Sequence, residues 1–414
     1  MTQEIVIIGG GPIGTWTALQ IKKRNSAIAV TIYERFQTYK RDHIMTIQEK
    51  SFRRSSADAL QEEAFLHKLC DLQATCSELC KPVSTTNKAG QFVMPPRLDI
   101  RTIEFEHFMK QECRNEGVNF VYKRVESPEV IMGMHPGCRQ FIAADGANSS
   151  MRSALWGEES MYRYKLFPSL DFKYKAVGQP RYMLESTFAD IAHLGLEYVS
   201  MQGPDGLADV NLRFIVSQEN YDKIRGGTFK EPLVVQEDSP FWGQMHGEPL
   251  FGGRTFKEDF YGFLKRREDY AGEVRANTPI TMTKIYLARY TTNSFAKMVP
   301  YKNEDRGWFL VGDAAMGMPF FRSVNSGLIL GAQLGQLLAM EKDVTKKVHH
   351  YNKRIRPMRI LEEFAITKYL ECKVHFLQKF ARPILFHAAR VPGLKRPVVQ
   401  PFDYIARLRG ARFP

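Results

Sequence analysis

The chain has 414 residues, of which 44% are hydrophobic and 25% are charged. This composition excludes a disordered, a collagen-like or a small disulfide-stapled protein, and the length suits one large or two interleaved domains. No uninterrupted apolar run approaches the roughly 18 residues of a spanning helix, and the N-terminus lacks a basic region and a cleavage site. We therefore expect neither a membrane-spanning helix nor a signal peptide. Six cysteines in so long a chain indicate reduced, cytoplasmic usage.

The basic character of the chain is concentrated near its C-terminus. The formal net charge is +13, and residues 341–414 hold 17 Lys and Arg against 6 Asp and Glu. That region therefore carries +11 of the net charge, and the first 340 residues are close to neutral.

The first elements predict the opening of a parallel α/β sheet. Residues 4–8 form a short apolar run that ends in glycines, residues 15–24 have helical periodicity, and residues 28–33 form a second, β-branched run. Strand, glycine turn, helix and strand in this order are typical of a Rossmann-like sheet.

Further helices and strands follow along the chain. The helical patterns lie at 57–82, 101–116 and 326–340, and the strand patterns at 118–122, 141–144, 284–290 and 308–311. Alternating segments within 162–216, such as 198–201 and 210–216, predict an antiparallel sheet with one covered face. The basic helices after residue 340 are interrupted by prolines.

The glycine turn between the first strand and helix predicts a dinucleotide site. Gly9 permits a tight turn, Gly11 lets the backbone approach a pyrophosphate, and Gly14 allows close helix–strand packing. Glu34 ends the second strand, 20 residues after Gly14, where a carboxylate accepts hydrogen bonds from an adenosine ribose and disfavours a 2′-phosphate. The alternative is a glycine turn with only a structural role.

Two further motifs follow apolar strands and precede predicted helices. One is the run from Asp145 to Arg152, and the other is Gly312-Asp313-Ala314-Ala315. Taken alone, either aspartate can be a helix cap.

Together, the three motifs resemble the FAD-dependent class A monooxygenases of the para-hydroxybenzoate hydroxylase type. The segments 34–45, 98–105 and 319–321 are also similar to the actin-oxidising (MICAL-type) branch. The resemblance implies a Rossmann-like FAD-binding domain at 1–160 and 280–345 and an interleaved antiparallel substrate domain at 161–279. A basic C-terminal helical region at 346–414 completes the expected organisation.

The same resemblance implies which residues contact FAD. The glycine turn would hold the ADP moiety, the Asp145 segment would lie near the pyrophosphate and the nicotinamide path, and Asp313 would bind the ribityl chain. The implied FAD-contacting residues are Gly9, Gly11, Pro12, Ile13, Gly14, Glu34, Arg35, Arg41, Arg101, Asp145, Gly146, Arg152, Gly312, Asp313 and Asn325. The family uses NAD(P)H as co-substrate without a second nucleotide motif, and the redox chemistry would belong to the cofactor.

The helix expected from Ser326 would direct its N-terminus at the flavin ring, where its dipole stabilises negative charge on the reduced flavin. Asn325 would then be the cap residue.

The loop after Asp313 departs from the family pattern. Met316 occupies a position that is His in many relatives, and Phe321 and Ser323 occupy glycine positions. Arg322 on this loop is a candidate active-site charge, and the alternative is a solvated side chain.

Substrate-site candidates come from this loop and from the antiparallel sheet. Met316, Phe320 and Phe321 would line an apolar pocket, with packing in the core as the alternative. His193, Tyr198 and Arg213 are sheet residues for which an ordinary structural role is the alternative. His67, Cys70, Cys76 and Cys80 lack the spacing of a zinc finger, so we expect buried thiols and no metal site.

The region from 375 to 414 mixes aromatic residues with Lys and Arg. It could bind an anionic membrane surface or an acidic protein, or form a packed helical cap with a solvated basic face. Nucleic acid is disfavoured because no reader fold is evident.

The sequence therefore predicts a cytoplasmic FAD-dependent monooxygenase that uses NAD(P)H and O2 on an apolar or aromatic small molecule, with peripheral membrane association left open. One alternative is an FAD-dependent reductase of the same fold, similar to geranylgeranyl reductase. The other is a non-catalytic FAD-containing module that binds partners through its basic tail.

Overall fold

The structure is a computed structural model that describes residues 3–38, 44–53, 59–73, 97–180, 194–245, 255–318 and 322–360. The chain divides into two units. The described residues of the first unit lie within Met1–Gln73, Thr85–Tyr164 and Ala288–Ala365, and those of the second unit lie within Lys165–Leu287. The long strands β7 (Met161–Val177) and β12 (Ile280–Thr292) contribute residues to both units.

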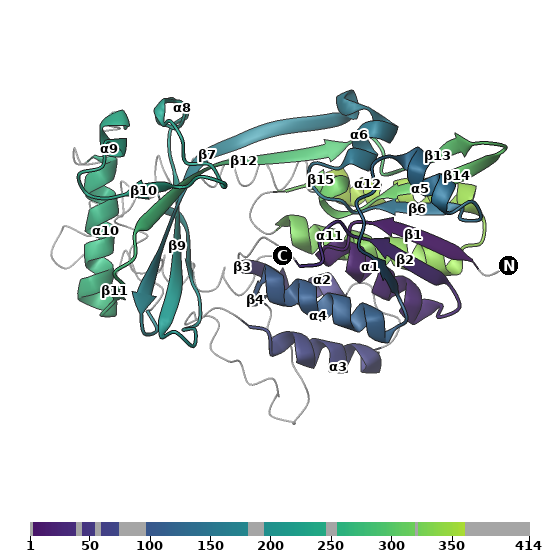
Figure 1. The fold of residues 1–414 in the computed structure, drawn as a ribbon, viewed down its shortest axis with the longest axis horizontal. Coiled ribbons are helices and arrows are strands. Elements are labelled where there is room, and N and C mark those ends of the chain that lie inside the picture. The colour runs from purple at the N-terminus through teal and green to yellow at the C-terminus, as the bar shows by residue number, and fades with distance from the viewer. Residues whose placement is uncertain are drawn as a thin grey trace. The chain divides into compact units, whose positions relative to one another are not determined.

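A six-stranded sheet forms the centre of the first unit (Figure 1). Its order is β13-β14-β6-β1-β2-β5, and all neighbouring strands are parallel except β13 and β14. The strands are β1 (Glu4–Ile8), β2 (Ala29–Tyr33), β5 (Asn119–Val121), β6 (Gln140–Ala143), β13 (Ala296–Tyr301) and β14 (Glu304–Leu310). The carboxyl ends of the parallel strands therefore lie at one edge, as the predicted Rossmann-like sheet requires.

The helices of the first unit are α1 (Pro12–Arg24), α2 (Lys50–Arg53), α3 (Ala59–Cys70), α4 (Thr102–Asn115), α5 (Pro128–Met134), α6 (Ser150–Trp156), α11 (Arg322–Met340) and α12 (Val344–Ile360). Two short 3-10 turns, η2 (Glu158–Ser160) and η3 (Gly312–Ala314), accompany them. The predicted helix at 57–82 is shorter than expected, because α3 ends at Cys70 and a turn follows it.

Helices α1 and α11 pack closely because α11 presents glycines to α1. A Cβ built at Gly327 would lie 2.9 Å from Ile13, one at Gly331 would lie 2.7 Å from the Thr17 hydroxyl, and one at Gly335 would lie 2.6 Å from Gln20. These glycines are four residues apart, so they follow one face of the helix. The Trp16 indole N–H also donates to the Leu328 carbonyl oxygen at 2.8 Å.

Helix α12 is fastened to the first-unit sheet by polar side chains. The buried Lys347 ammonium donates to Gln140 Oε1 at 2.6 Å and to the Leu338 carbonyl oxygen. The Tyr351 hydroxyl donates to the Leu310 carbonyl oxygen at 3.0 Å, and the Asn352 amide bonds to the backbone of Ala296. Helix α12 is therefore an integral part of this unit.

A mostly antiparallel sheet forms the second unit, in the order β10-β12-β7-β9-β8. The other strands in it are β8 (Leu194–Val199), β9 (Leu207–Ile215) and β10 (Leu233–Val235). One face packs against α10 (Phe256–Ala271) through an aromatic core that includes Phe172, Phe214 and Phe260 (Figure 1). The predicted antiparallel sheet with a covered face is confirmed.

Smaller elements complete the described chain: α8 (Gln218–Lys223), α9 (Phe241–Gln244), β11 (Val274–Arg275), β15 (Met316–Gly317), and the two-stranded sheet of β3 (Ile44–Gln48) and β4 (Arg97–Arg101). Among the described residues, no helix combines the length and the hydropathy that crossing a bilayer requires.

Candidate functional site

The glycine turn after β1 forms a cradle that larger residues would block. Gly9 has φ +107°, and a Cβ there would lie 2.3 Å from the Ala144 carbonyl oxygen. A Cβ at Gly14 would lie 2.1 Å from the Gly9 carbonyl oxygen, whereas one at Gly11 would meet nothing within 4 Å. No side chain caps the N-terminus of α1. The first-turn N–H groups thus face the space beside Gly11, where an anion fits.

Glu34 is fixed beside this turn by backbone donors. Its Oε2 accepts a hydrogen bond from the Gly10 N–H at 2.7 Å, and its Oε1 accepts one from the Phe36 N–H at 2.9 Å. Each carboxylate oxygen retains a lone pair for a ribose hydroxyl. The neighbouring Arg35 is exposed and its guanidinium lies 4.6 Å from the Phe36 ring centroid.

Asp145 begins the second motif at the end of β6. Its Oδ2 accepts hydrogen bonds from the Met151 N–H at 3.3 Å and the Ser150 hydroxyl at 3.4 Å, while its buried Oδ1 has no partner among the described residues. Burial raises the pKa of this carboxyl. Gly146 follows with φ +87°, and Ser149 caps α6 by accepting from the Arg152 N–H. An unpartnered carboxylate oxygen and a glycine with positive φ at this edge fit a ligand-binding loop.

Arg152 joins the second motif to the third. The side chain is 2% exposed. Its guanidinium donates to the carbonyl oxygens of Ala314 at 3.0 Å, Asp313 at 3.5 Å and Ala147 at 2.8 Å. Arg152 is thus a buried connection between two loops rather than an accessible cation.

Asp313 lies in η3 at the third motif. One of its carboxylate oxygens accepts a hydrogen bond from the Ser323 hydroxyl, whose oxygen in turn accepts from the Met318 N–H at 3.3 Å. Gly312 has φ +61° and packs on Ile13, to which a Cβ at position 312 would come within 3.1 Å. Contacts by Gly312 and Arg152 therefore bring all three motifs together at one edge of the sheet.

The prediction that the last long helix starts at Ser326 is wrong. Helix α11 begins at Arg322, so Asn325 lies in its first turn instead of at a cap position. The Asn325 side chain accepts from the Gln48 N–H at 2.8 Å and the Ser51 hydroxyl at 2.7 Å, and donates to the Thr46 carbonyl oxygen at 2.8 Å. These bonds tie α11 to β3 and α2.

The remaining predicted site residues of the first unit lie at helix starts, in the core or outside the described residues. Arg101 is half-buried where β4 passes into α4, and Arg322 opens α11. Met316 is 2% exposed within the hydrophobic core, which favours the packing alternative for this residue. Arg41, Phe320, Phe321 and His193 lie outside the described residues.

The two sheet candidates lie in the second unit. The Arg213 guanidinium makes a two-point ion pair with the Asp171 carboxylate at 2.6 and 2.8 Å. Tyr198 is buried on the neighbouring strand and is 4% exposed. The carboxylate raises the pKa of Arg213, so this cation is already neutralised by a protein partner.

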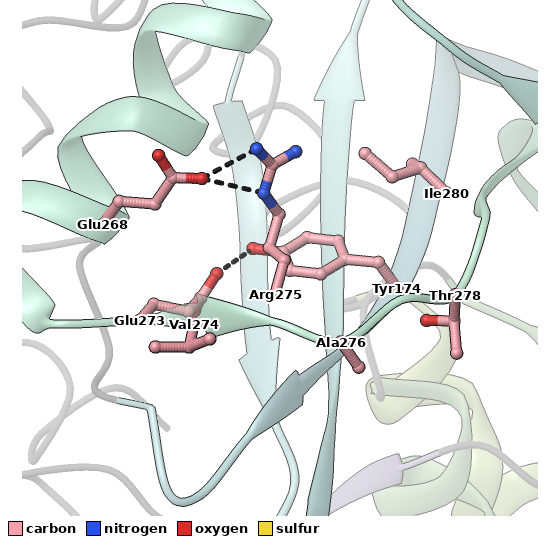
Figure 2. A pocket seen from close by; sticks show the side chains of 8 residues that line it. All are labelled: Tyr174, Glu268, Glu273, Val274, Arg275, Ala276, Thr278 and Ile280. Carbon is pink, nitrogen blue, oxygen red and sulfur yellow. Dashed lines mark hydrogen bonds and ion pairs between the residues drawn. The ribbon is translucent and has the colours of Figure 1, made fainter.

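The second unit also holds a cavity of about 370 Å³ that sequence analysis did not predict (Figure 2). Figure 2 shows the Arg275–Glu268 ion pair and the Tyr174 hydroxyl donating to Glu273. The buried Arg267 guanidinium pairs with Glu273 and with Glu197. No predicted site residue lines this cavity, and its carboxylates and its arginine are bonded to protein partners.

Two side chains next to the third motif were not predicted to contribute to the site. The Ser323 hydroxyl donates a hydrogen bond to Asp313. Tyr290 on β12 pairs with Gly317 on β15, and its phenol ring packs over this glycine. Tyr290 belongs to no motif, and Ser323 was noted only as the replacement of a family glycine, because each residue reaches the site through a tertiary contact.

Comparisons with known proteins identify the fold. No protein-family model matches the chain, and no curated protein matches its sequence. Solved structures match over most of its length. The oxygenase of 2-methyl-3-hydroxypyridine-5-carboxylic acid, in its tetrameric form, is 12% identical with a TM-score of 0.54, covering 94% of this chain and 96% of that chain. The chain has the fold of the FAD-dependent class A monooxygenases.

Two other structures support the same fold. The tetracycline destructase Tet(51) is 13% identical with a TM-score of 0.51 over the full length of both chains. The Diels-Alderase PyrE3 of the pyrroindomycin pathway is 14% identical with a TM-score of 0.53, covering 97% of this chain and 80% of that chain. The predicted fold is confirmed. The activities of these proteins differ, as expected of a fold that hosts several chemistries.

Proposed function

We propose that the chain is an FAD-dependent monooxygenase that uses NAD(P)H and O2 to oxygenate an apolar or aromatic small molecule. The observation that carries this proposal is the convergence of three loops at one edge of one parallel sheet. The glycine turn, the Asp145 segment and the Asp313 segment are joined there by buried Arg152 and by packing of Gly312 on Ile13. The shared fold of known oxygenases supports it.

The residues present fit FAD. The open space at Gly11 and the uncapped N-terminus of α1 would hold the pyrophosphate, and the fixed carboxylate of Glu34 would hold the adenosine ribose. Asp313, whose carboxylate accepts from the Ser323 hydroxyl, would hold the ribityl chain. When bound, FAD supplies the hydride acceptance and oxygen chemistry.

The protein's own groups would position and shield the reacting molecules. Tyr198 and Arg213 stay predictions as substrate contacts, because they belong to the second unit. The basic region after Ile360 stays a prediction as a docking element for an anionic membrane surface or an acidic protein.

The visible spectrum of the purified protein tests the proposed cofactor. The unmodified protein should be yellow or take up added FAD with quenching of flavin fluorescence. Asp313→Ala should weaken FAD binding about tenfold or more, because a charged acceptor at the ribityl position is lost. Asp305→Ala is the matched control, since Asp305 is exposed on β14 of the same unit.

A colourless protein that does not bind FAD contradicts the proposal. If FAD binds, NADPH-dependent oxygen consumption with a panel of aromatic substrates separates a monooxygenase from a reductase of the same fold. Substrate-stimulated consumption with an oxygenated product is expected, and FAD binding without any such product would favour the reductase.

A further inference from the structure

Arg163 of β7, Tyr290 of β12 and Gly317 of β15 belong to the first unit and form a row across these three strands. Tyr290 on β12 is directly opposite Gly317 on β15. The Asn293 N–H donates to the Ser160 carbonyl oxygen at 3.3 Å, which fixes the antiparallel pairing of β12 with β7 at its start. Ser160 immediately precedes β7 and Asn293 immediately follows β12, so counting three residues into each strand from this bond, we infer that Arg163 is opposite Tyr290. Directly opposite residues project from the same face of a sheet.

The neighbouring pair supports this register. Tyr164 and Arg289 are opposite each other by the same count, and the Arg289 guanidinium lies 5.0 Å from the Tyr164 ring centroid. Because side chains alternate along a strand, this pair occupies the other face. The row of Arg163, Tyr290 and Gly317 therefore lies on the opposite face from Tyr164 and Arg289.

Tyr290 covers the glycine in this row. A Cβ built at Gly317 would lie 2.1 Å from the Tyr290 Cζ and 2.4 Å from its hydroxyl oxygen, so only glycine admits the ring there. The Tyr290 ring is half-buried, and its hydroxyl makes no hydrogen bond within the described ranges. The phenol is a free donor beside the loop that begins at Asp313.

Neither arginine next to Tyr290 forms an ion pair with a carboxylate of the described residues. Arg163 is exposed and makes no ion pair or hydrogen bond within the part of the chain that the structure describes. The Arg152 guanidinium lies 6.0 Å from the Tyr290 ring centroid and bonds only to carbonyl oxygens. Burial lowers the pKa of Arg152, and the like charge of Arg163 lowers it further.

Acidic groups also face this cluster. Glu158 and Asp145 interact with Arg152, and Asp313 raises the pKa of Tyr290 beyond the effect of burial. None of these carboxylates forms an ion pair with either arginine among the described residues. Two positive charges that lie close together without an ion-pair partner repel each other. Binding of an anion between or beside them is therefore favoured.

We propose that Arg163 and Tyr290 form an anion-binding subsite, beside buried Arg152, for a phosphate group of a nucleotide. Arg163 supplies the accessible charge and Tyr290 donates a hydrogen bond through its hydroxyl. This inference rests on the proposed function, in which two such nucleotides, FAD and NAD(P)H, meet the protein. The phosphate belongs to one of them.

Binding of inorganic pyrophosphate to the full-length protein, measured by calorimetry, tests the subsite without requiring FAD. Arg163→Gln should weaken pyrophosphate binding about tenfold, and Tyr290→Phe should weaken it by a smaller factor. Arg139→Gln is the matched control, because Arg139 is exposed before β6 at the opposite edge of the sheet. Pyrophosphate bound at the glycine turn would be insensitive to either substitution.

Affinities for FAD and for NADPH then identify the source of the phosphate. Weaker FAD binding in Arg163→Gln assigns the subsite to FAD, and weaker NADPH binding by the FAD-loaded variant assigns it to the nicotinamide nucleotide. Unchanged binding of pyrophosphate, FAD and NADPH, relative to Arg139→Gln, overturns the inference. If the unmodified protein binds no FAD, the proposed function fails and the pyrophosphate measurement still decides this subsite.

Discussion

Arg152 illustrates how a motif residue can have a structural role in a binding site. The sequence places it in a loop that the resemblance connects with a pyrophosphate, yet its guanidinium bonds to backbone carbonyls of two loops. A buried cation with several carbonyl acceptors is well solvated by the protein. Its contribution to a cofactor would come through loop position and charge, and not through direct contact.

Arg152→Met should therefore lower the free energy of unfolding by about 3 kcal/mol, because the Ala314 and Ala147 carbonyl oxygens lose charged donors in a buried place. Urea denaturation monitored by tryptophan fluorescence measures the change. Arg163→Gln, at an exposed arginine without partners, should stay within about 0.5 kcal/mol of the unmodified protein. Equal stability of Arg152→Met and the unmodified protein would refute the structural role.

At the scale of elements, the packing of α1 on α11 fixes the start of α1 relative to the third motif. The three glycines of α11 bring the helices together, and Gly327 contacts the same Ile13 side chain on which Gly312 packs. The glycine turn and the Asp313 loop are thus held by one interface. Larger side chains on this face of α11 would separate them.

Gly331→Ala should be destabilising by about 1–3 kcal/mol, since the new methyl group would lie 2.7 Å from the Thr17 hydroxyl and 3.2 Å from the Trp16 ring. Gly262→Ala in α10 is the control. A Cβ there meets only the end of Arg266 at 3.8 Å, so higher helix propensity should stabilise that variant by about 0.5–1 kcal/mol. Thermal unfolding of both variants gives the comparison, and stabilisation by Gly331→Ala would contradict the close packing.

Local patterns were sufficient to predict β1, α1 and β2, because apolar periodicity and the glycine turn act within about 30 residues. They were insufficient for the start of α11. Asn325 bonds to residues that precede it by more than 270 positions, and no local signal reveals such partners. The roles of Ser323 and Tyr290 were missed for the same reason: each depends on a tertiary contact or a strand register.

At the scale of the molecule, buried charges within the first unit make its stability depend on pH. Lys347 on α12 is fully buried, and burial lowers its pKa from an ordinary 10.5 to about 8. In the unfolded chain this amine keeps its ordinary pKa. Between pH 8 and about 10.5 the unfolded state therefore binds more protons, and the free energy of unfolding rises with pH over this window.

The contribution of Lys347 is measurable as a difference between the unmodified protein and Lys347→Met. The free energy of unfolding of the unmodified protein, relative to this variant, should increase from pH 8 to pH 10 with a slope of at most about 1.4 kcal/mol per pH unit. Below pH 8 the difference should be constant. Urea denaturation at pH 7, 8, 9 and 10 checks both statements, and a difference that is flat across the whole series would show that Lys347 titrates normally.

The attachment of α12 determines where the polypeptide can be shortened. A deletion that begins after Met340 removes Lys347, Tyr351 and Asn352, and it leaves the Gln140 side chain and the Leu310 and Ala296 carbonyl oxygens without these donors. Loss of partner binding in such a protein could not be assigned to the basic region, because the first unit itself would be destabilised. A stop codon placed after Ile360 keeps every described bond of this helix, so it is the boundary from which the role of the basic extension can be judged.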